Sequence, residues 1–111
     1  MTYTAKTFTI PTLVGISAQS VEEHIKLYQG YVKHFNLINE TIKTLEASGE
    51  DHTYQISELT RRVSFEYNGS KNHEYYFESL EGGAQEINTQ STLYAKITST
   101  WGSFENWLDH F

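Results

Sequence analysis

The stretch SVEEHIKLYQGYVKHFNLINETIKTLEASGED, residues 20–51, decides the fold because it predicts the first of two long helices. Ser20 is followed three residues later by Glu23, a capping-box pattern that predicts a helix start at Ser20. The polar run ASGED, which contains a glycine, is where the helix should end. Apolar side chains recur every three or four positions between these ends, at Val21, Ile25, Tyr28, Val32, Phe35, Ile38, Ile42 and Leu45.

A second long helix is predicted from Tyr54 to Leu80. Its inward positions again follow spacings of three, four and their sums, and Gly69 marks a candidate interruption. Two long helices joined by a short polar link predict an antiparallel helical hairpin. The inward positions are Ile56, Leu59, Val63, His73, Phe77 and Leu80.

The remaining segments predict an arm and two short helices. Residues 1–18 hold β-branched residues, the only proline and a glycine, which favours an extended arm laid over the core. EGGAQEINTQ, residues 81–90, is typical of a loop, residues 93–100 predict a short helix, and residues 101–111 predict one more. The fold class expected is therefore mainly α, with an extended N-terminal arm followed by a long antiparallel helical hairpin.

Composition and charge exclude several classes of function. A chain of 111 residues fits one modest domain, and a net charge of −6 with only eight Lys and Arg argues against a nucleic-acid partner. The chain has no cysteine, so any metal must be held by His, Asp or Glu. No apolar run approaches the length of a membrane span or a signal peptide, so we expect no membrane partner and a cytoplasmic location.

Two of the five histidines fall on the inward stripes of the predicted helices. At about 100° per residue, His24 lies within the stripe of the first helix, whereas Glu23 points toward its polar flank. His73 lies within the stripe of the second, so a hairpin could bring both imidazoles together. Two readings stay open for this pair, hydrogen-bonded core residues or metal ligands. Surface positions are expected for the others, His34, His52 and His110.

Two imidazoles alone do not complete a metal site. Iron or manganese needs further donors, and structural zinc needs four ligands. The sequence has no HExxH motif, phosphate-binding loop or serine nucleophile elbow that would indicate another chemistry. A set of tyrosines on the two helices favours core packing over chemistry, and it comprises Tyr28, Tyr31, Tyr75 and Tyr76.

Three segments carry a resemblance to one family. They are GISAQSVEEHIKLYQGYV at residues 15–32, FEYNGSKNHEYYFESLEGG at residues 65–83 and ITSTWGSFENWLDHF at residues 97–111. In that order they resemble the N-terminal half of the iron/manganese superoxide dismutases: the first ligand helix, the second ligand helix, and the segment that opens the C-terminal half. The Asn-His pair followed by an aromatic run is the most specific of these matches.

The resemblance implies a set of site residues. His24 and His73 would be metal ligands for one iron or manganese ion per complete site. Tyr31 matches the active-site tyrosine of the family, which joins a hydrogen-bond network to metal-bound solvent. Asn72, beside the second ligand, is also typical of the family. Gly69 resembles the glycine of the manganese type, where many iron enzymes carry glutamine, and metal preference stays open.

The first helix departs from the family pattern in two ways. Aligned without a gap on Tyr31, the first ligand of the family falls on Glu23, and His24 is one residue too close. The helical-face argument favours His24, with a deletion or a local bulge in the helix to restore its aim. The paired histidines that follow the first ligand in the family are here Leu27 and Tyr28.

The resemblance also implies a second half. It divides the chain into an N-terminal helical hairpin domain at residues 1–90 and, at residues 91–111, the truncated start of a C-terminal α/β domain. The remaining family ligands, an Asp and a His on that α/β domain, have no counterpart, since Asp109 and His110 lack the flanking motif. An aromatic cluster near the end suggests a face to be covered, formed by Trp101, Phe104, Trp107 and Phe111.

The expected function is conversion of superoxide to dioxygen and hydrogen peroxide by metal redox cycling, once the chain is completed by a C-terminal half. Its expected partners are superoxide, that half or another subunit, and a second copy in a homodimer. The alternative is a non-catalytic superoxide dismutase-like interaction or structural module. An unrelated four-helix metal carrier is a third hypothesis.

Overall fold

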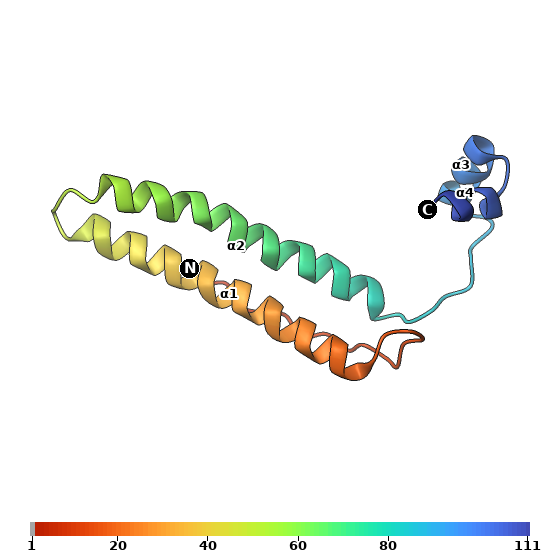
Figure 1. Ribbon diagram of the computed structural model, residues 1–111, viewed down its shortest axis with the longest axis horizontal. Helices are drawn as coiled ribbons and strands as arrows, with labels where there is room; N and C mark the ends of the chain where they lie inside the picture. The colour runs from red at the N-terminus through yellow and green to blue at the C-terminus, as the bar shows by residue number, and fades with distance from the viewer. Residues whose placement is uncertain (1) are drawn as a thin grey trace.

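A computed structural model describes residues 2–111, so residue 1 of the predicted arm lies outside it. It contains four helices, α1 (Ala18–Ala47), α2 (Thr53–Leu80), α3 (Thr92–Trp101) and α4 (Phe104–His110). No strand occurs among residues 2–111. Helices α1 and α2 lie side by side and antiparallel (Figure 1), which confirms the mainly α fold with a long helical hairpin. None of the described helices is long and apolar enough to cross a membrane.

The long helices differ from the prediction in two places, the start of α1 and the candidate interruption at Gly69. Helix α1 begins at Ala18 with Ser17 as its N-cap, whose side-chain oxygen accepts a hydrogen bond from the Ser20 amide at 3.1 Å. The prediction that Ser20 caps the helix was therefore wrong, because Ser17 satisfies a free amide of the first turn one turn earlier. Helix α2 runs through Gly69 without interruption.

The hairpin core is small and mostly aromatic. Tyr28, Val32 and Phe77 are its buried apolar residues. The extended arm contributes Phe8, whose ring centroid lies 5.1 Å from that of Phe77 and 5.7 Å from that of Tyr28. Burying an aromatic side chain of this kind contributes about 1.5 to 3 kcal/mol. Further side chains pack around this cluster, namely Tyr3, Ala5, Ile10, Ile25 and Leu80.

Polar side chains of the hairpin hold the backbone of the arm. Asn36 of α1 accepts a hydrogen bond from the Tyr3 amide at 2.8 Å and donates one to the Tyr3 carbonyl oxygen at 2.7 Å. The Thr9 amide donates to Glu81 at 2.8 Å. These contacts take the place of a neighbouring strand, because an extended backbone must satisfy its polar groups somewhere. The predicted arm over the core is present.

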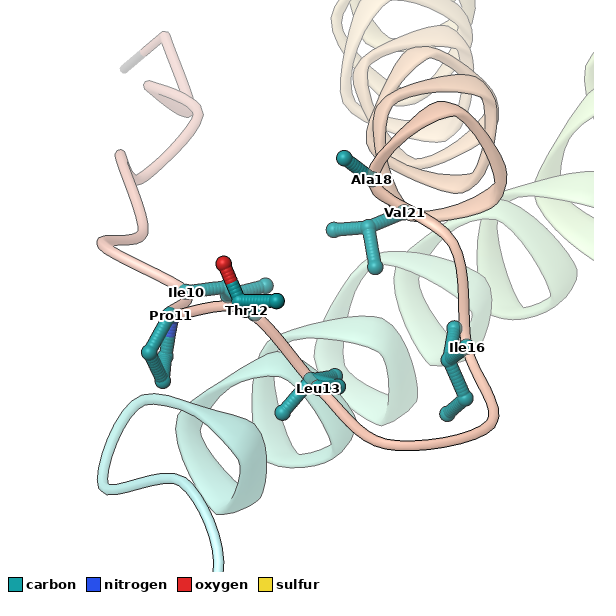
Figure 2. Close-up of a pocket in the computed structure, with 7 residues that line it drawn as sticks. All are labelled: Ile10, Pro11, Thr12, Leu13, Ile16, Ala18 and Val21. Carbon is teal, nitrogen blue, oxygen red and sulfur yellow. The ribbon is translucent and has the colours of Figure 1, made fainter.

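The arm bends at the open end of the hairpin and encloses a small apolar pocket of about 170 Å³ (Figure 2). Gly83, with a φ of 62°, follows α2 there, and a Cβ on it would lie 3.2 Å from Pro11. No titratable side chain lines the pocket, so it supplies packing rather than chemistry. Its lining residues are Ile10, Pro11, Thr12, Leu13, Ile16, Ala18 and Val21.

Helices α3 and α4 form a separate small pair beyond the open end of the hairpin (Figure 1). The rings of Tyr94 and Phe104 stack at 5.8 Å between centroids and hold the pair together. Among the described residues, helix-to-helix packing is confined to α1 with α2 and α3 with α4. The molecule is consequently elongated, measuring 63 × 32 × 22 Å.

Candidate metal centre

His24 of α1 and His73 of α2 face each other across the hairpin. Their ring centroids lie 4.8 Å apart with the ring planes at 81°. Both side chains are half-buried. The antiparallel packing of two amphipathic helices is what brings together residues 49 positions apart in the sequence.

The helix itself fixes the tautomer of His73. Its Nδ1 lies 2.6 Å from the carbonyl oxygen of Gly69, one turn earlier in α2. A carbonyl oxygen can only accept a hydrogen bond, so Nδ1 carries the proton and Nε2 keeps its lone pair. Histidine ligands of metals are commonly oriented in this way, through a hydrogen bond from the nitrogen that does not bind the metal.

His24 is held neutral by its surroundings. Burial lowers the pKa of His24 below its usual value of 6.5, and the charge that His73 can carry lowers the pKa of His24 further. The rings of Tyr76 and Phe77 each lie 5.1 Å from the His24 ring and form an aromatic wall beside it. A neutral imidazole at neutral pH has the lone pair that a metal ligand requires.

The geometry distinguishes His24 from its neighbour Glu23. The Glu23 side chain is 62% exposed and pairs with Lys26 at 2.8 Å on the outer face of the hairpin. Helix α1 is α-helical without a bulge from Ala18 to Ala47. Of the two alternatives, a deletion or a local bulge, the regular helix excludes the bulge and leaves the deletion. His24 faces His73 through ordinary helical periodicity.

Tyr31 lies beside the pair and against Gly69. The Tyr31 ring centroid is 5.1 Å from that of His73. A Cβ built on Gly69 would stand 2.6 Å from the Cε1 atom of Tyr31, which no side chain tolerates. Glycine at position 69 therefore allows the two helices to approach with Tyr31 between them.

Asn72, Leu27 and Tyr28 are the other positions that were compared with the family, and they differ in exposure. Asn72 is exposed. Leu27 is 64% exposed, whereas Tyr28 is fully buried. The expectation of core packing holds for Tyr28 and is wrong for Tyr75 and Tyr76, which are 63% and 41% exposed.

Sequence reasoning missed a buried carboxylate next to His73. Glu74 is fully buried and accepts hydrogen bonds from Lys71 at 2.7 Å, from Tyr28 at 3.1 Å and from the Tyr3 hydroxyl. Burial alone would raise the pKa of Glu74, but the hydrogen bonds from Lys71, Tyr3 and Tyr28 outweigh it and hold that pKa at about 2. Burial and the hydrogen bond to Glu74 in turn raise the pKa of Tyr3 to about 12. The only local signal was the spacing of three between Lys71 and Glu74.

The donor set fits part of a transition-metal site. Two neutral imidazoles on adjacent helices suit such an ion. Within residues 2–111, no group of three or more His, Asp or Glu side chains is placed to hold a metal. Within the described residues the hairpin therefore offers at most two imidazole nitrogens at this position, which is fewer than a complete metal site requires.

Comparison with known proteins points to one class of enzyme. The chain is 32% identical over 92 residues to the superoxide dismutase [Fe] of Tetrahymena pyriformis, covering 79% of this chain and 46% of that protein. It is 29% identical over 100 residues to the superoxide dismutase [Mn] of Chlamydia trachomatis serovar D, covering 86% of this chain and 47% of that protein. No protein-family model matches the chain, and no solved structure does.

These similarities confirm the resemblance predicted from the three sequence segments. The chain is similar over most of its length to one iron and one manganese superoxide dismutase. It spans about half the length of the curated relatives that it matches.

Proposed function

We propose that this chain is the N-terminal part of an iron/manganese superoxide dismutase, completed by a C-terminal half that carries the remaining metal ligands. One observation supports this most: two half-buried imidazoles face each other, in a chain similar to two proteins that carry that name. A bound iron or manganese ion would supply the one-electron chemistry that converts superoxide to dioxygen and hydrogen peroxide.

Each residue of the hairpin site has a role in this proposal. His24 and His73 bind the metal, and the Gly69 carbonyl oxygen orients His73 so that Nε2 is the donor. Tyr31, held against Gly69, carries a hydroxyl that can hold or pass on a proton. Asn72 is exposed beside His73, where it would meet the completing half.

The surface of the chain supports a completing partner. The chain exposes 8527 Å², whereas a compact monomer of this mass exposes about 6,300 Å². Exposed aromatic side chains occur in α3 and directly after α4, where Trp101 is 41% and Phe111 is 93% exposed. We therefore propose that residues 1–90 form the hairpin domain, that residues 91–111 begin the second domain, and that the completed protein is a homodimer.

The test is reconstitution. The chain is refolded with iron or manganese and with the C-terminal half of the Tetrahymena pyriformis enzyme, and metal content and superoxide dismutation are measured. We expect both to appear in the mixture, and His24→Ala and His73→Ala each to abolish them.

Glu23→Ala is the matched control, because Glu23 neighbours His24 and points outward. It should leave metal content unchanged. Loss of metal with Glu23→Ala and retention with His24→Ala would assign the first ligand position to Glu23. Retention of metal and activity in both histidine variants would refute the proposed site.

A further inference from the structure

We propose that the N-terminal arm, residues 2–10, positions the histidine pair, acting through Glu74 and Tyr28. The proposal rests on the proposed function for the role of the two histidines as metal ligands. The contacts that connect the arm to the two histidine rings do not depend on the proposed function. Tyr3, Glu74 and Tyr28 are positioning residues here.

The first link joins the arm to Glu74. The Tyr3 hydroxyl donates to the Glu74 carboxylate, and the Lys6 ammonium group lies 3.4 Å from it. Lys71 donates to the same carboxylate from within α2. A fully buried carboxylate is stable only with such partners, so the position of Glu74 depends on a docked arm.

The second link joins Glu74 and the arm backbone to Tyr28. The Tyr28 hydroxyl donates to Glu74 at 3.1 Å and accepts a hydrogen bond from the Lys6 amide at 2.8 Å. The Tyr28 hydroxyl is thus held by one partner on α2 and one on the arm. Its two hydrogen bonds fix where the buried Tyr28 ring lies.

The third link joins these rings to the histidines. The Tyr28 ring is stacked on that of His73, with centroids 6.5 Å apart and planes at 25°. Phe77 lies 5.1 Å from the His24 ring, and Phe8 of the arm lies 5.1 Å from Phe77. The arm therefore packs against Tyr28 and Phe77, the rings that contact the two imidazoles. Because this packing is close, displacing the arm would displace the imidazoles.

The test uses the full chain with Tyr3→Phe, which keeps the ring of Tyr3 and removes its hydrogen bond to Glu74. Tyr67→Phe is the matched control, because the Tyr67 ring packs against Tyr3 but its hydroxyl is outside the network. The first readout is the ring nitrogen and carbon resonances of His24 and His73, recorded well below the unfolding temperature. The second readout is the affinity of the chain for Zn²⁺ with no other metal present, and the same resonances are used to monitor the titration.

We expect Tyr3→Phe to shift the resonances of both histidine rings and to weaken Zn²⁺ binding about tenfold, the low end of the range for residues that support metal ligands. Tyr67→Phe should change neither. Glu74→Gln, which breaks the same link from the other side, should shift both rings in a Zn²⁺-free sample.

Unchanged ring resonances in Tyr3→Phe and Glu74→Gln would overturn the proposal, even if both variants unfold more easily, because the arm would then contribute stability alone. Because two imidazoles do not complete a metal site, a chain that binds no Zn²⁺ on its own leaves the ligand role of the histidines to the reconstitution experiment, whose failure would refute the proposed function alone. The ring resonances of the metal-free protein still decide whether the arm positions them.

Discussion

Gly69 contacts both sides of the candidate site. Its carbonyl oxygen accepts the His73 Nδ1 hydrogen, and its lack of a side chain leaves room for the Tyr31 ring. A glutamine at this position, as in many iron enzymes of the family, could not coexist with Tyr31 as it lies here. The packing of this hairpin thus requires glycine for a steric reason.

Gly69→Ala tests this requirement. We expect a loss of about 1 to 3 kcal/mol in the free energy of unfolding, since the added methyl group overlaps the Tyr31 ring. Gly30→Ala is the control, because a Cβ there meets no heavy atom of the described residues within 4 Å. It should stabilise α1 by about 0.5 to 1 kcal/mol. Urea denaturation of both variants measures the difference, and equal effects would contradict the steric reading.

Glu74 should make stability depend on acid pH. Its pKa falls from the usual 4.5 to about 2 in the folded chain. A carboxyl with a depressed folded pKa contributes stability above its unfolded pKa and loses that contribution as pH falls through its folded value. We expect Glu74→Gln to cost about 1.5 to 3 kcal/mol at neutral pH, because the half-buried Lys71 and Tyr3 side chains lose their charged acceptor. The difference from the unaltered chain should shrink between about pH 4.5 and about pH 2, and a constant difference would contradict this assignment.

Among the elements, the long helices were predictable because their information is local. Apolar side chains at spacings of three and four define one face wherever the helix lies, and that face must be buried. The same periodicity placed His24 and His73 inward and Glu23 outward. The start of α1 was not predictable in this way, because Ser17 and Ser20 are both good caps and the choice depends on the path of the arm.

Ser17→Ala and Ser20→Ala compare the two candidate caps. Ser17→Ala should lower the free energy of unfolding by about 1 kcal/mol, since it removes the acceptor for the Ser20 amide. Ser20→Ala should have no such cost, because alanine favours the first turn of a helix. Thermal denaturation followed by circular dichroism measures both. A larger loss with Ser20→Ala would restore the predicted start.

The arm and its network could be predicted only in outline. The pattern of residues 1–18 indicated an extended segment over the core. Tyr3 and Glu74 are 71 positions apart, and nothing in local periodicity pairs them. Burial of a charged residue beside His73 runs against the usual expectation for glutamate, so the network follows only from three-dimensional packing.

The shape of the whole molecule is elongated, and its exposed surface is correspondingly large. The radius of gyration is 20.4 Å, against about 13 Å for a compact domain of this length. The hairpin and the pair α3 and α4 share no helix-to-helix packing within residues 2–111. Surface left by this arrangement is available to a completing half.

Both tryptophans of the chain lie in α3 and α4, so their fluorescence reports on this surface. Trp101 is 41% exposed. On addition of the C-terminal half used for reconstitution, we expect a blue shift of the emission and less quenching by iodide, because the indole rings leave water. A spectrum unchanged by a stoichiometric amount of that half would show that α3 and α4 do not contact it.

The length of the hairpin separates its closed end from the histidines. Residues 48–52 join α1 and α2 there, and at 1.5 Å per residue they lie about 36 Å along α1 from His24 and about 32 Å along α2 from His73. An affinity tag, a dye or a fused reporter domain inserted in this turn would leave the imidazoles untouched. The same insert at the N-terminus would be attached to the arm that contacts Glu74 and could displace it. Probes for this protein therefore belong at the turn.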